Sequence, residues 1–382
     1  MKKILLISYR FYPENDPRAF RTYELAKELA KKYDVTVLTK NTFSDLSEIK
    51  NKYNFKVEEI PSGFFLNKSN GNFSKKAIEI CKKNKKNNLL ALCLKKLFNY
   101  IFYSREIEFS YEIFKFLKNS KEKYDVVISI AVPFSCHIGT WLSFKNKKGT
   151  KIILEYGDPF YFNPSSEKIA PYFKYLEKKI LNFSDYITIP IEEAKESFKY
   201  YGKKNLDKIR IIPQGINFKE IEIEKYSKNT IPTFIYAGIF YEKIRNPIKF
   251  LKAIENIKND YGFFIYTDLE RLEKDDMGKE ILSLINRNKR IILKNKISRQ
   301  ECIKIMSSMD FLVNIKNLGG VQTPSKLIDY GIVKRPVYSF NENEFSLQEF
   351  KEFLNGNYKN SLDIDISPFD IKNVTEKFEE LF

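Results

Sequence analysis

Short apolar runs alternate with segments of helical periodicity near the start of the chain. The first run covers residues 4–7, a loop with two prolines follows over residues 9–17, and a second run covers residues 34–39. Between the loop and the second run, apolar side chains at positions 23, 26, 29, 30 and 33 recur at the spacing of one helix face. A strand, a helix and a strand in this order predict a parallel βαβ unit.

The same alternation continues in two series. The later strand-like runs of the first series are residues 126–129, 151–154, 186–189 and 209–212. A turn at residues 213–215 and a polar stretch separate it from a second series, with runs at residues 233–237, 262–266, 290–293, 311–313 and 336–338. The pattern predicts two doubly wound α/β domains, 1–213 and 214–369, with a C-terminal helix at 370–382 packing back on the first. We expect a ligand in the cleft between the two halves.

Composition limits the class of protein. With 382 residues and 43% hydrophobic content, the chain can fill more than one core. It has no apolar stretch of the ~20 residues that span a bilayer and no signal peptide, so we expect a cytoplasmic protein. The four cysteines form no Cys-x-x-Cys pair and the single histidine, His137, lies apart from them, which argues against a disulfide framework or a zinc site.

The net charge of +17 indicates a polyanionic partner, which can be nucleic acid, anionic lipid or a phosphorylated substrate. A biased genome would also explain the lysines, and composition does not choose between these explanations. No Gly-x-Gly-x-x-Gly follows the first strand of either half, which argues against NAD or FAD, and the chain has no Walker A sequence.

The strongest local signal is the start of a helix at residues 323–330. Thr323 suits the N-cap and Pro324 suits the first helical position. Gly319 and Gly320, just upstream, permit close approach of the backbone to a ligand. Free backbone N–H groups and the positive end of the helix make such a place an anion site.

Two side chains of the same helix add candidate chemistry. Lys326 brings a positive charge to the first turn, where it would stabilise a departing pyrophosphate. Asp329 lies about one turn beyond Ser325 and could accept hydrogen bonds from two adjacent hydroxyls, as on a ribose. Taken alone, these residues equally suit a capped helix with a surface lysine and aspartate.

Five segments in order resemble the motifs of family 4 glycosyltransferases, which have the GT-B fold. Residues 323–337 are similar to the family's "P-S-K-L-x-E-Y … G-K-P-V" segment. The other four are residues 11–14 with the helix after them, 155–159 ("E-x-R-D"), 212–217 ("I-P-N-G-V-D") and 236–238 ("Y-x-G"). The resemblance implies an enzyme that transfers a sugar from a nucleotide-sugar donor, with retention of configuration and without a bound metal or other cofactor.

The resemblance also implies roles for residues on the donor side. Asp329 takes the place of the glutamate that binds the donor ribose, and Gly238 matches the glycine of "Y-x-G". Arg245 takes the place of a basic residue that neutralises the donor phosphates, and Lys243 in the same loop is a second candidate. Ile239 replaces an arginine that many relatives have, so this neutralisation would rest on Arg245, Lys243 and Lys326.

Other departures affect the sugar and the N-terminal loop. Val321 stands where other family members carry a glutamate that recognises the donor sugar, so the identity of the sugar cannot be inferred from this sequence. Asp16-Pro17 replaces a Gly-Gly pair in the N-terminal loop, and Arg18 and Arg21 are expected to reach a phosphate or the acceptor instead.

Asp158 is the candidate for contact with the acceptor hydroxyl or the developing positive charge on the sugar, because it follows a predicted strand. The alternative is an ordinary turn residue before Pro159. Many relatives have a histidine beside this aspartate, where this chain has Gly157. His137 is surrounded in sequence by apolar residues, and we interpret it as a packing residue.

Residues 74–103 form a basic segment with leucines at helical spacing. Such a helix can lie on an anionic membrane, which would bring the enzyme at the inner face of the plasma membrane to a lipid-linked acceptor. It can equally pack its apolar stripe on the core and leave a solvated basic face.

The sequence therefore predicts a retaining, metal-independent glycosyltransferase with a saccharide or lipid-linked acceptor, in synthesis of bacterial cell-surface polysaccharide or lipopolysaccharide. Two alternatives remain: a GT-B nucleotide-sugar epimerase or hydrolase, and a non-catalytic basic protein that binds membrane or RNA. A nucleic-acid partner is not expected, since no RRM, KH or helix-turn-helix signature occurs.

Overall fold

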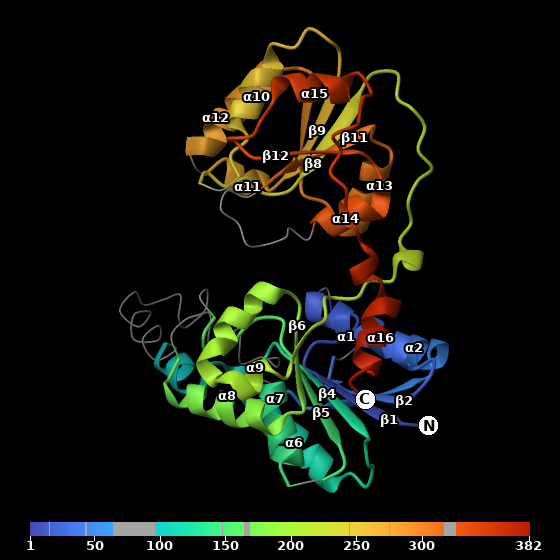
Figure 1. Ribbon diagram of the computed structural model, residues 1–382, viewed down its shortest axis with the longest axis vertical. Helices are drawn as coiled ribbons and strands as arrows, with labels where there is room; N and C mark the ends of the chain where they lie inside the picture. Colours follow the sequence, from blue (N-terminus) through green and yellow to red (C-terminus); the bar gives the residue numbers. More distant parts are fainter. Residues whose placement is uncertain are drawn as a thin grey trace, which may run out of the picture. The chain divides into compact units, whose positions relative to one another are not determined.

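The chain folds into two units (Figure 1). The computed structural model describes residues 1–14, 16–42, 44–63, 96–146, 148–163, 169–243, 245–274, 276–316 and 326–382. Unit 1 comprises Met1–Ile216 together with Pro368–Phe382, and unit 2 comprises Asn217–Ser367. The turn predicted at residues 213–215 therefore lies at the end of the first stretch of unit 1, and the last residues of the chain return to that unit.

Unit 1 contains a seven-stranded sheet in the order β3-β2-β1-β4-β5-β6-β7, in which every neighbouring pair is parallel. Its strands are β1 (Lys3–Ser8), β2 (Asp34–Lys40), β3 (Phe55–Ile60), β4 (Val126–Ile130), β5 (Lys151–Glu155), β6 (Tyr186–Ile189) and β7 (Ile209–Ile211). Each of the six predicted runs of this unit forms one of these strands. The edge strand β3 was not predicted, because its buried and exposed residues alternate instead of forming a continuous apolar run.

Alternate residues of the central strand β1 fill two separate cores. Leu5 and Ile7 face one core, and Ile4 and Leu6 face the other. The helices α6 (Phe109–Asn119), α7 (Ser135–Phe144) and α8 (Tyr172–Phe183) contribute to the first core. The second core includes side chains of α1 (Pro17–Leu29), α2 (Ser47–Lys52) and α16 (Ile371–Glu379).

The first helix begins earlier than the apolar spacing predicts. The Asp16 side chain caps α1 by accepting a hydrogen bond from the Arg18 backbone N–H at 2.8 Å, and Pro17 occupies the first helical position. The helix ends at Leu29, so the prediction of helix as far as residue 33 was wrong. An aspartate followed by a proline is itself a helix-start signal, and it places Arg18 in the first turn.

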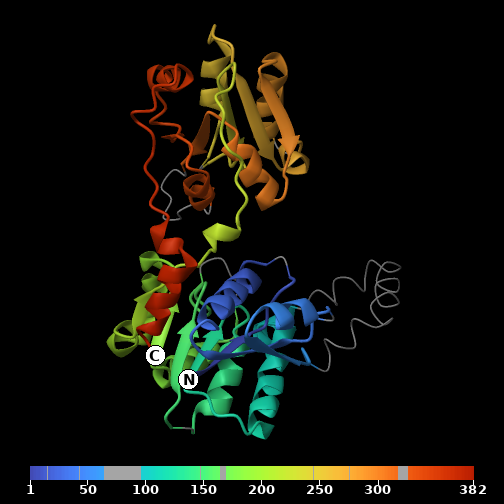
Figure 2. The same cartoon turned by 90° about the vertical axis from the view of Figure 1, so that its right-hand side faces the viewer.

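Unit 2 contains a five-stranded parallel sheet in the order β10-β9-β8-β11-β12. Its strands are β8 (Thr233–Ala237), β9 (Gly262–Thr267), β10 (Ile291–Asn295), β11 (Phe311–Ile315) and β12 (Val337–Phe340), which correspond to the five predicted runs. Its helices are α10 (Ile248–Glu255), α11 (Leu269–Leu272), α12 (Asp276–Arg287), α13 (Arg299–Ser307), α14 (Lys326–Val333) and α15 (Leu347–Leu354). Figure 2 shows the strands of this sheet between its helices.

The two faces of the second sheet again have separate cores. Phe234 and Tyr236 of β8 pack with α10, α12 and α15, whereas Ile235 packs with α13 and α14. Since α13 and α14 share one face, their side chains can meet near the carboxyl ends of the strands. This arrangement positions the candidate site of unit 2.

Short helical turns complete the described chain. They are η1 (Arg105–Glu108), η2 (Glu192–Tyr201), α9 (Lys203–Leu206), η3 (Phe218–Glu220) and η4 (Ser367–Phe369). Residues 96–102 are also helical, and the rest of the basic segment as far as residue 95 lies outside the described residues. In the described part of the chain, none of the helices has the length and apolar character needed to cross a bilayer.

Candidate functional site

A cavity of about 340 Å³ opens at the carboxyl ends of the strands of unit 2. Parallel α/β sheets bind their ligands at this edge. The cavity is lined by residues at or just after the ends of β8, β9 and β10 and by residues of α13 and α14: Ala237, Gly238, Ile239, Tyr266, Thr267, Asp268, Lys296, Ile297, Arg299, Cys302, Met306, Lys326, Asp329 and Tyr330.

Lys326, at the start of the described part of α14, reaches across the cavity wall to the end of β8. Its Nζ lies 4.3 Å from the centre of the Tyr236 ring, on the face of that ring. Gly238 has a φ of +151°, and a Cβ at this position would lie 1.6 Å from the Lys326 Nζ. Gly238 is therefore required for two reasons, its backbone conformation and the space that the lysine occupies.

The Lys326 ammonium is held in an environment that disfavours its charge. Burial, followed by repulsion from the nearby Arg245, lowers the pKa of Lys326 to about 7. An anionic ligand in the cavity would reverse this effect, because it would favour the protonated lysine.

Arg245 lies next to this lysine but does not line the cavity. Its side chain is 9% exposed, and its Nη1 donates to the Ile239 carbonyl at 3.4 Å. Its backbone pairs with Tyr241 in an isolated bridge that closes the loop. Lys243, in the same loop, is exposed to solvent. Arg245 thus contributes positive potential near Lys326 from behind the wall, and Lys243 does not reach the cavity.

Asp329, one turn after Lys326, lines the cavity and is paired with a residue that the sequence analysis missed. Its Oδ1 accepts hydrogen bonds from Arg299 Nε at 2.8 Å and Nη2 at 2.6 Å. Burial raises the pKa of Asp329, and the Arg299 guanidinium partly offsets this. Both hydrogen bonds from Arg299 go to Oδ1, so the Oδ2 atom of Asp329 is the one that a ligand hydroxyl would contact. A capping box formed by Ser298 and Glu301 fixes the start of α13, and Arg299 is the first residue of that helix. The capping-box motif can be recognised in the sequence, and it would have predicted a helix that starts at Arg299.

Four further predicted donor residues lie outside the described residues. They are Gly319, Gly320, Thr323 and Ser325. The predicted anion site at the backbone of the helix start therefore stays a prediction.

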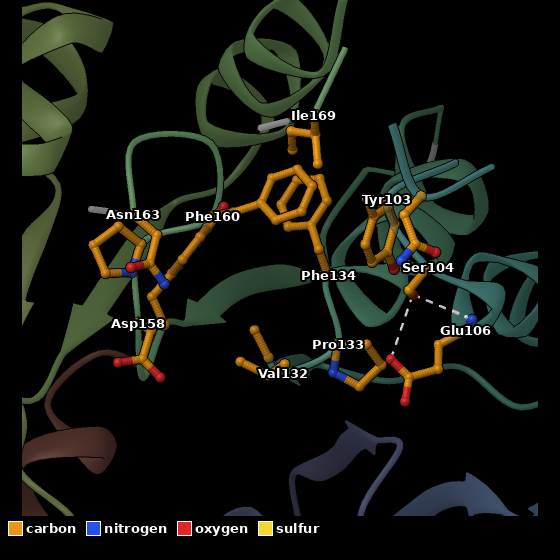
Figure 3. Close-up of a pocket in the computed structure, with 14 residues that line it drawn as sticks. Tyr103, Ser104, Glu106, Val132, Pro133, Phe134, Asp158, Phe160, Asn163 and Ile169 are labelled. Carbon is orange, nitrogen blue, oxygen red and sulfur yellow. Dashed lines mark hydrogen bonds between the residues drawn. The ribbon is translucent and has the colours of Figure 1, made fainter. Parts of the chain in front are cut away.

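Unit 1 has its own cavity, of about 430 Å³, where β4 and β5 end (Figure 3). Its lining is largely apolar and aromatic, with polar groups near its edges: Asn99, Tyr103, Ser104, Glu106, Ala131, Val132, Pro133, Phe134, Tyr156, Asp158, Pro159, Phe160, Asn163 and Ile169. Such a composition is typical of a pocket for an organic ligand.

Aromatic rings form the wall between two polar ends of this cavity. Phe134 and Phe160 stack with ring centres 3.9 Å apart, and Tyr103 meets Phe160 edge-on at 5.2 Å. In Figure 3, Asp158 lies on one side of this wall and Ser104 and Glu106 lie on the other.

Asp158 is exposed and is contacted by Arg18 of α1. The Arg18 Nη2 lies 3.5 Å from Asp158 Oδ2, and its Nη1 lies 3.4 Å from Oε1 of the fully buried Glu155. A Cβ at Gly157 would lie 1.1 Å from the Arg18 Nη2. The glycine therefore leaves the space in which the arginine reaches Asp158.

Arg21, one turn further along α1, lies deeper. Its Nε is 2.9 Å from Glu155 Oε1, its Nη2 donates to the Ile212 carbonyl at 3.1 Å, and its side chain is 3% exposed. Arg21 supports Glu155, and only Arg18 of the two predicted arginines reaches Asp158.

Two buried titratable groups lie behind the cavity. His137 is fully buried, its Nδ1 is 2.8 Å from the Ser129 hydroxyl, and burial lowers the pKa of His137 to about 3. Burial also raises the pKa of Glu177 to about 7, and this carboxyl accepts a hydrogen bond from the Tyr201 hydroxyl. His137 thus has the environment of a packing residue, and Glu177 had no signal in the sequence.

Comparison with protein families decides the class. The model of the family described as Glycosyltransferase Family 4 matches residues 19–220, more than half of the chain. The chain belongs to glycosyltransferase family 4. A search of curated proteins found no match.

Solved structures share the fold of this glycosyltransferase over its full length. A glycosyltransferase from Rickettsia africae has a TM-score of 0.57 at 14% identity, with 100% of this chain and 97% of that chain covered. The lipopolysaccharide outer core galactosyltransferase WaaB has a TM-score of 0.54 at 13% identity, with coverage of 100% and 99%. HepE from Anabaena, in complex with UDP and glucose, has a TM-score of 0.52 at 10% identity, with the same coverage. The prediction of two Rossmann-like domains of the GT-B type is confirmed.

Family membership favours a glycosyltransferase over the epimerase and the non-catalytic alternatives. The structure also explains why this chain has a glycine where many family members have a histidine beside the aspartate. Where many relatives have a side chain beside the aspartate, this glycosyltransferase has Gly157, and the Arg18 guanidinium from a different element occupies that space.

The close fit of Arg18 to Gly157 predicts strong coupling between the two positions. Gly157→Ala should lower the free energy of unfolding by about 1–3 kcal/mol, because the new methyl group must displace the guanidinium. In the Arg18→Ala background the same change should cost little, so that a double-mutant cycle in urea gives a coupling energy of about 1 kcal/mol or more. Additive effects of the two substitutions would show that the arginine does not occupy this space.

The lowered pKa of Lys326 predicts that an anionic ligand binds together with a proton. At pH 8 the free lysine is mostly neutral, since burial lowers its pKa to about 7. A bound diphosphate favours the charged form, so its affinity should rise as the pH falls from 9 to 7 and level off below. Calorimetry of UDP in buffers of different ionisation enthalpy at pH 8 should show uptake of about 0.5–1 proton. Lys326→Met should abolish this proton uptake. Equal proton uptake in that variant would show that another group takes up the proton.

Proposed function

We propose that this glycosyltransferase moves a sugar from a nucleoside diphosphate sugar to a saccharide or lipid-linked saccharide, with retention of anomeric configuration and without a metal ion. The observation that carries the proposal is the cavity of unit 2. Lys326, whose pKa is lowered, and the Asp329 carboxylate both belong to α14 and both line this cavity. Lys326 suits the diphosphate and Asp329 suits the ribose of one nucleotide.

The donor site needs positive charge to stabilise the negative charge that builds up on the departing phosphate as the sugar–phosphate bond breaks. Lys326 lines the cavity, and Arg245 adds positive potential from behind its wall. Fixed cations in a site from which water is partly excluded stabilise a departing phosphate without reorganising at the moment of reaction. In this proposal they do the work that a divalent cation does in metal-dependent enzymes.

Asp329 is the proposed ribose ligand, oriented by Arg299. The guanidinium bonds to one carboxylate oxygen, so the other is available to hydroxyl groups of the ligand. This carboxylate has a fixed direction before the nucleotide binds, which lowers the entropic cost of binding.

The proposed transfer proceeds on one face of the sugar. The bond between the anomeric carbon and the phosphate oxygen breaks, and the acceptor oxygen forms a bond to the same carbon from the same side. The proton of the acceptor hydroxyl passes to the departing phosphate oxygen, so that a nucleoside diphosphate and a glycoside are the products. Asp158 would stabilise the positive charge on the sugar or hold the acceptor hydroxyl.

The cavity of unit 1 is the proposed acceptor site. Asp158 forms part of its lining, and stacked aromatic rings form the adjoining wall. Aromatic faces suit the C–H faces of a sugar ring, and the polar groups at the edges suit its hydroxyls.

The proposed setting is bacterial cell-surface polysaccharide or lipopolysaccharide synthesis at the inner face of the plasma membrane. The fold shared with the lipopolysaccharide galactosyltransferase and with the UDP and glucose complex supports this proposal at the level of the fold.

A panel of nucleotide sugars, supplied with membranes of the source organism as acceptor, tests the reaction. We expect one donor to give a glycosylated product whose anomeric configuration by NMR equals that of the donor, at the same rate with and without EDTA. Inversion of configuration would contradict the proposed course of transfer, and loss of activity with EDTA would contradict metal independence.

A further inference from the structure

The helix at residues 96–102 exposes a continuous apolar surface. Leu97 is 54% exposed, Tyr100 is 43% exposed and Phe102 is 42% exposed. Phe98 and Ile101 between them are also exposed. Soluble proteins seldom leave consecutive large apolar side chains in water, and such patches mark contact surfaces.

The start of α8 extends this surface with tyrosines and lysines. The Tyr172 hydroxyl donates to the carbonyl of Ile101, so the two helices are joined there. Tyr172 is 48% exposed and Tyr175, one turn later, is 68% exposed. Lys178 and Lys179 are exposed on the following turn of the same face. We refer to residues 97–102 with Tyr172, Tyr175, Lys178 and Lys179 as the aromatic–lysine face.

The aromatic–lysine face adjoins the cavity of unit 1. Asn99 and Tyr103 belong to the same stretch of chain as its apolar residues, and both line that cavity. The backbone N–H of Ala170, two residues before the start of α8, donates to the Tyr100 carbonyl at 2.8 Å. The stretch of chain that exposes the apolar side chains therefore also contributes to the wall of the cavity.

The chemistry of the face matches a lipid bilayer with anionic headgroups. Tyrosine side chains concentrate at membrane interfaces, because the ring is apolar and the hydroxyl is polar. Apolar side chains that enter the acyl boundary and lysines that meet anionic headgroups are the two components of interfacial binding. An acidic protein would satisfy the lysines but would leave the row of apolar side chains at residues 97–102 without a matching surface.

We propose that the aromatic–lysine face docks on an anionic lipid bilayer and thereby holds the cavity of unit 1 against a lipid-linked acceptor. This inference rests on the proposed function for its acceptor, and it narrows that acceptor to a membrane-borne molecule. The docking itself depends only on the exposed side chains.

Co-sedimentation with vesicles of phosphatidylcholine, with and without phosphatidylglycerol, tests the docking. The full chain should sediment with the anionic vesicles in low salt and be released in high salt. The double variant Tyr172→Ser/Tyr175→Ser and the double variant Lys178→Glu/Lys179→Glu should each reduce the bound fraction at least fivefold.

Matched controls lie on α6 of the same unit. Tyr111 is 61% exposed, and Lys115 and Lys118 are exposed on the same helix. Tyr111→Ser and Lys115→Glu/Lys118→Glu should leave vesicle binding unchanged. No sedimentation of the unaltered chain, or an equal loss in the α6 variants, would overturn the proposal.

A second measurement separates this inference from the proposed function. With native membranes and radiolabelled nucleotide sugars, the label should enter a product that partitions into organic solvent, and the Tyr172→Ser/Tyr175→Ser variant should form at least fivefold less of it. Label only in water-soluble product would overturn the lipid-linked acceptor. Vesicle binding without product from any donor would instead contradict the proposed function and leave docking intact.

Discussion

Lys326→Ala is expected to lower kcat/KM for the nucleotide-sugar donor by about 10²–10³-fold, the usual effect of removing one group that stabilises developing negative charge. The Lys326 Nζ lines the cavity of unit 2 and lies against the face of Tyr236. Steady-state kinetics with the donor identified by the panel would measure the effect. The fold should be retained, because burial already disfavours the charged form of this lysine.

Lys258→Ala provides the matched control, since Lys258 is an exposed lysine of the same unit. It should leave kcat/KM unchanged within error. A thermal melt should place both variants close to the unaltered chain. Equal activity of the Lys326 and Lys258 variants would remove Lys326 from the donor site.

Asp158→Asn is expected to lower kcat by about 10²-fold or more, in the range for loss of a group that assists proton transfer or stabilises charge in the transition state. The substitution keeps the shape of the side chain and removes its charge, and the Asp158 side chain is 63% exposed, so the structure should tolerate it. Donor affinity measured by calorimetry should stay unchanged, because the donor cavity belongs to the other unit.

Asp207→Asn is a suitable control for this variant, because Asp207 is an exposed aspartate of unit 1 that follows α9. Full activity is expected. An Asp158→Asn enzyme with normal kcat would reduce Asp158 to the turn residue that the sequence also allowed.

Most of the fold could be read from the sequence, because buried parallel strands form continuous apolar runs. This signal found the strands of both sheets except β3, whose alternating burial hides an edge strand. The bounds of α1 could not be read from the apolar spacing, because that spacing reports the buried face of a helix, whereas the Asp16 cap marks its start.

The candidate site was only partly readable. Gly238, Lys326 and Asp329 were predicted from motifs and lie around one cavity. Arg299 pairs with Asp329 from 30 positions away, a contact that no local pattern encodes. The Arg18 contact at Gly157 likewise depends on two elements that only the fold brings together.

The aromatic wall of the unit 1 cavity shows the same limit. In the sequence, Phe134 and Phe160 look like ordinary apolar residues. They stack because β4 and β5 are paired in parallel, so that the segments that follow the two strands start next to each other. Sequence motifs thus indicated more of the residues around the cavity of unit 2 than of those around the cavity of unit 1.

The central claim is that the cavity of unit 2 binds a nucleoside diphosphate, and calorimetric titration tests it most directly. A panel of UDP, GDP and CMP with the unaltered chain should identify one ligand that binds. Lys326→Ala should weaken binding of that ligand by about tenfold or more, in line with the loss of a charge-assisted contact. Arg245→Ala should weaken it less, because Arg245 does not line the cavity and acts on the ligand through its positive potential. Unchanged affinity in both variants, with Lys258→Ala as the reference, would contradict the assignment of the donor site.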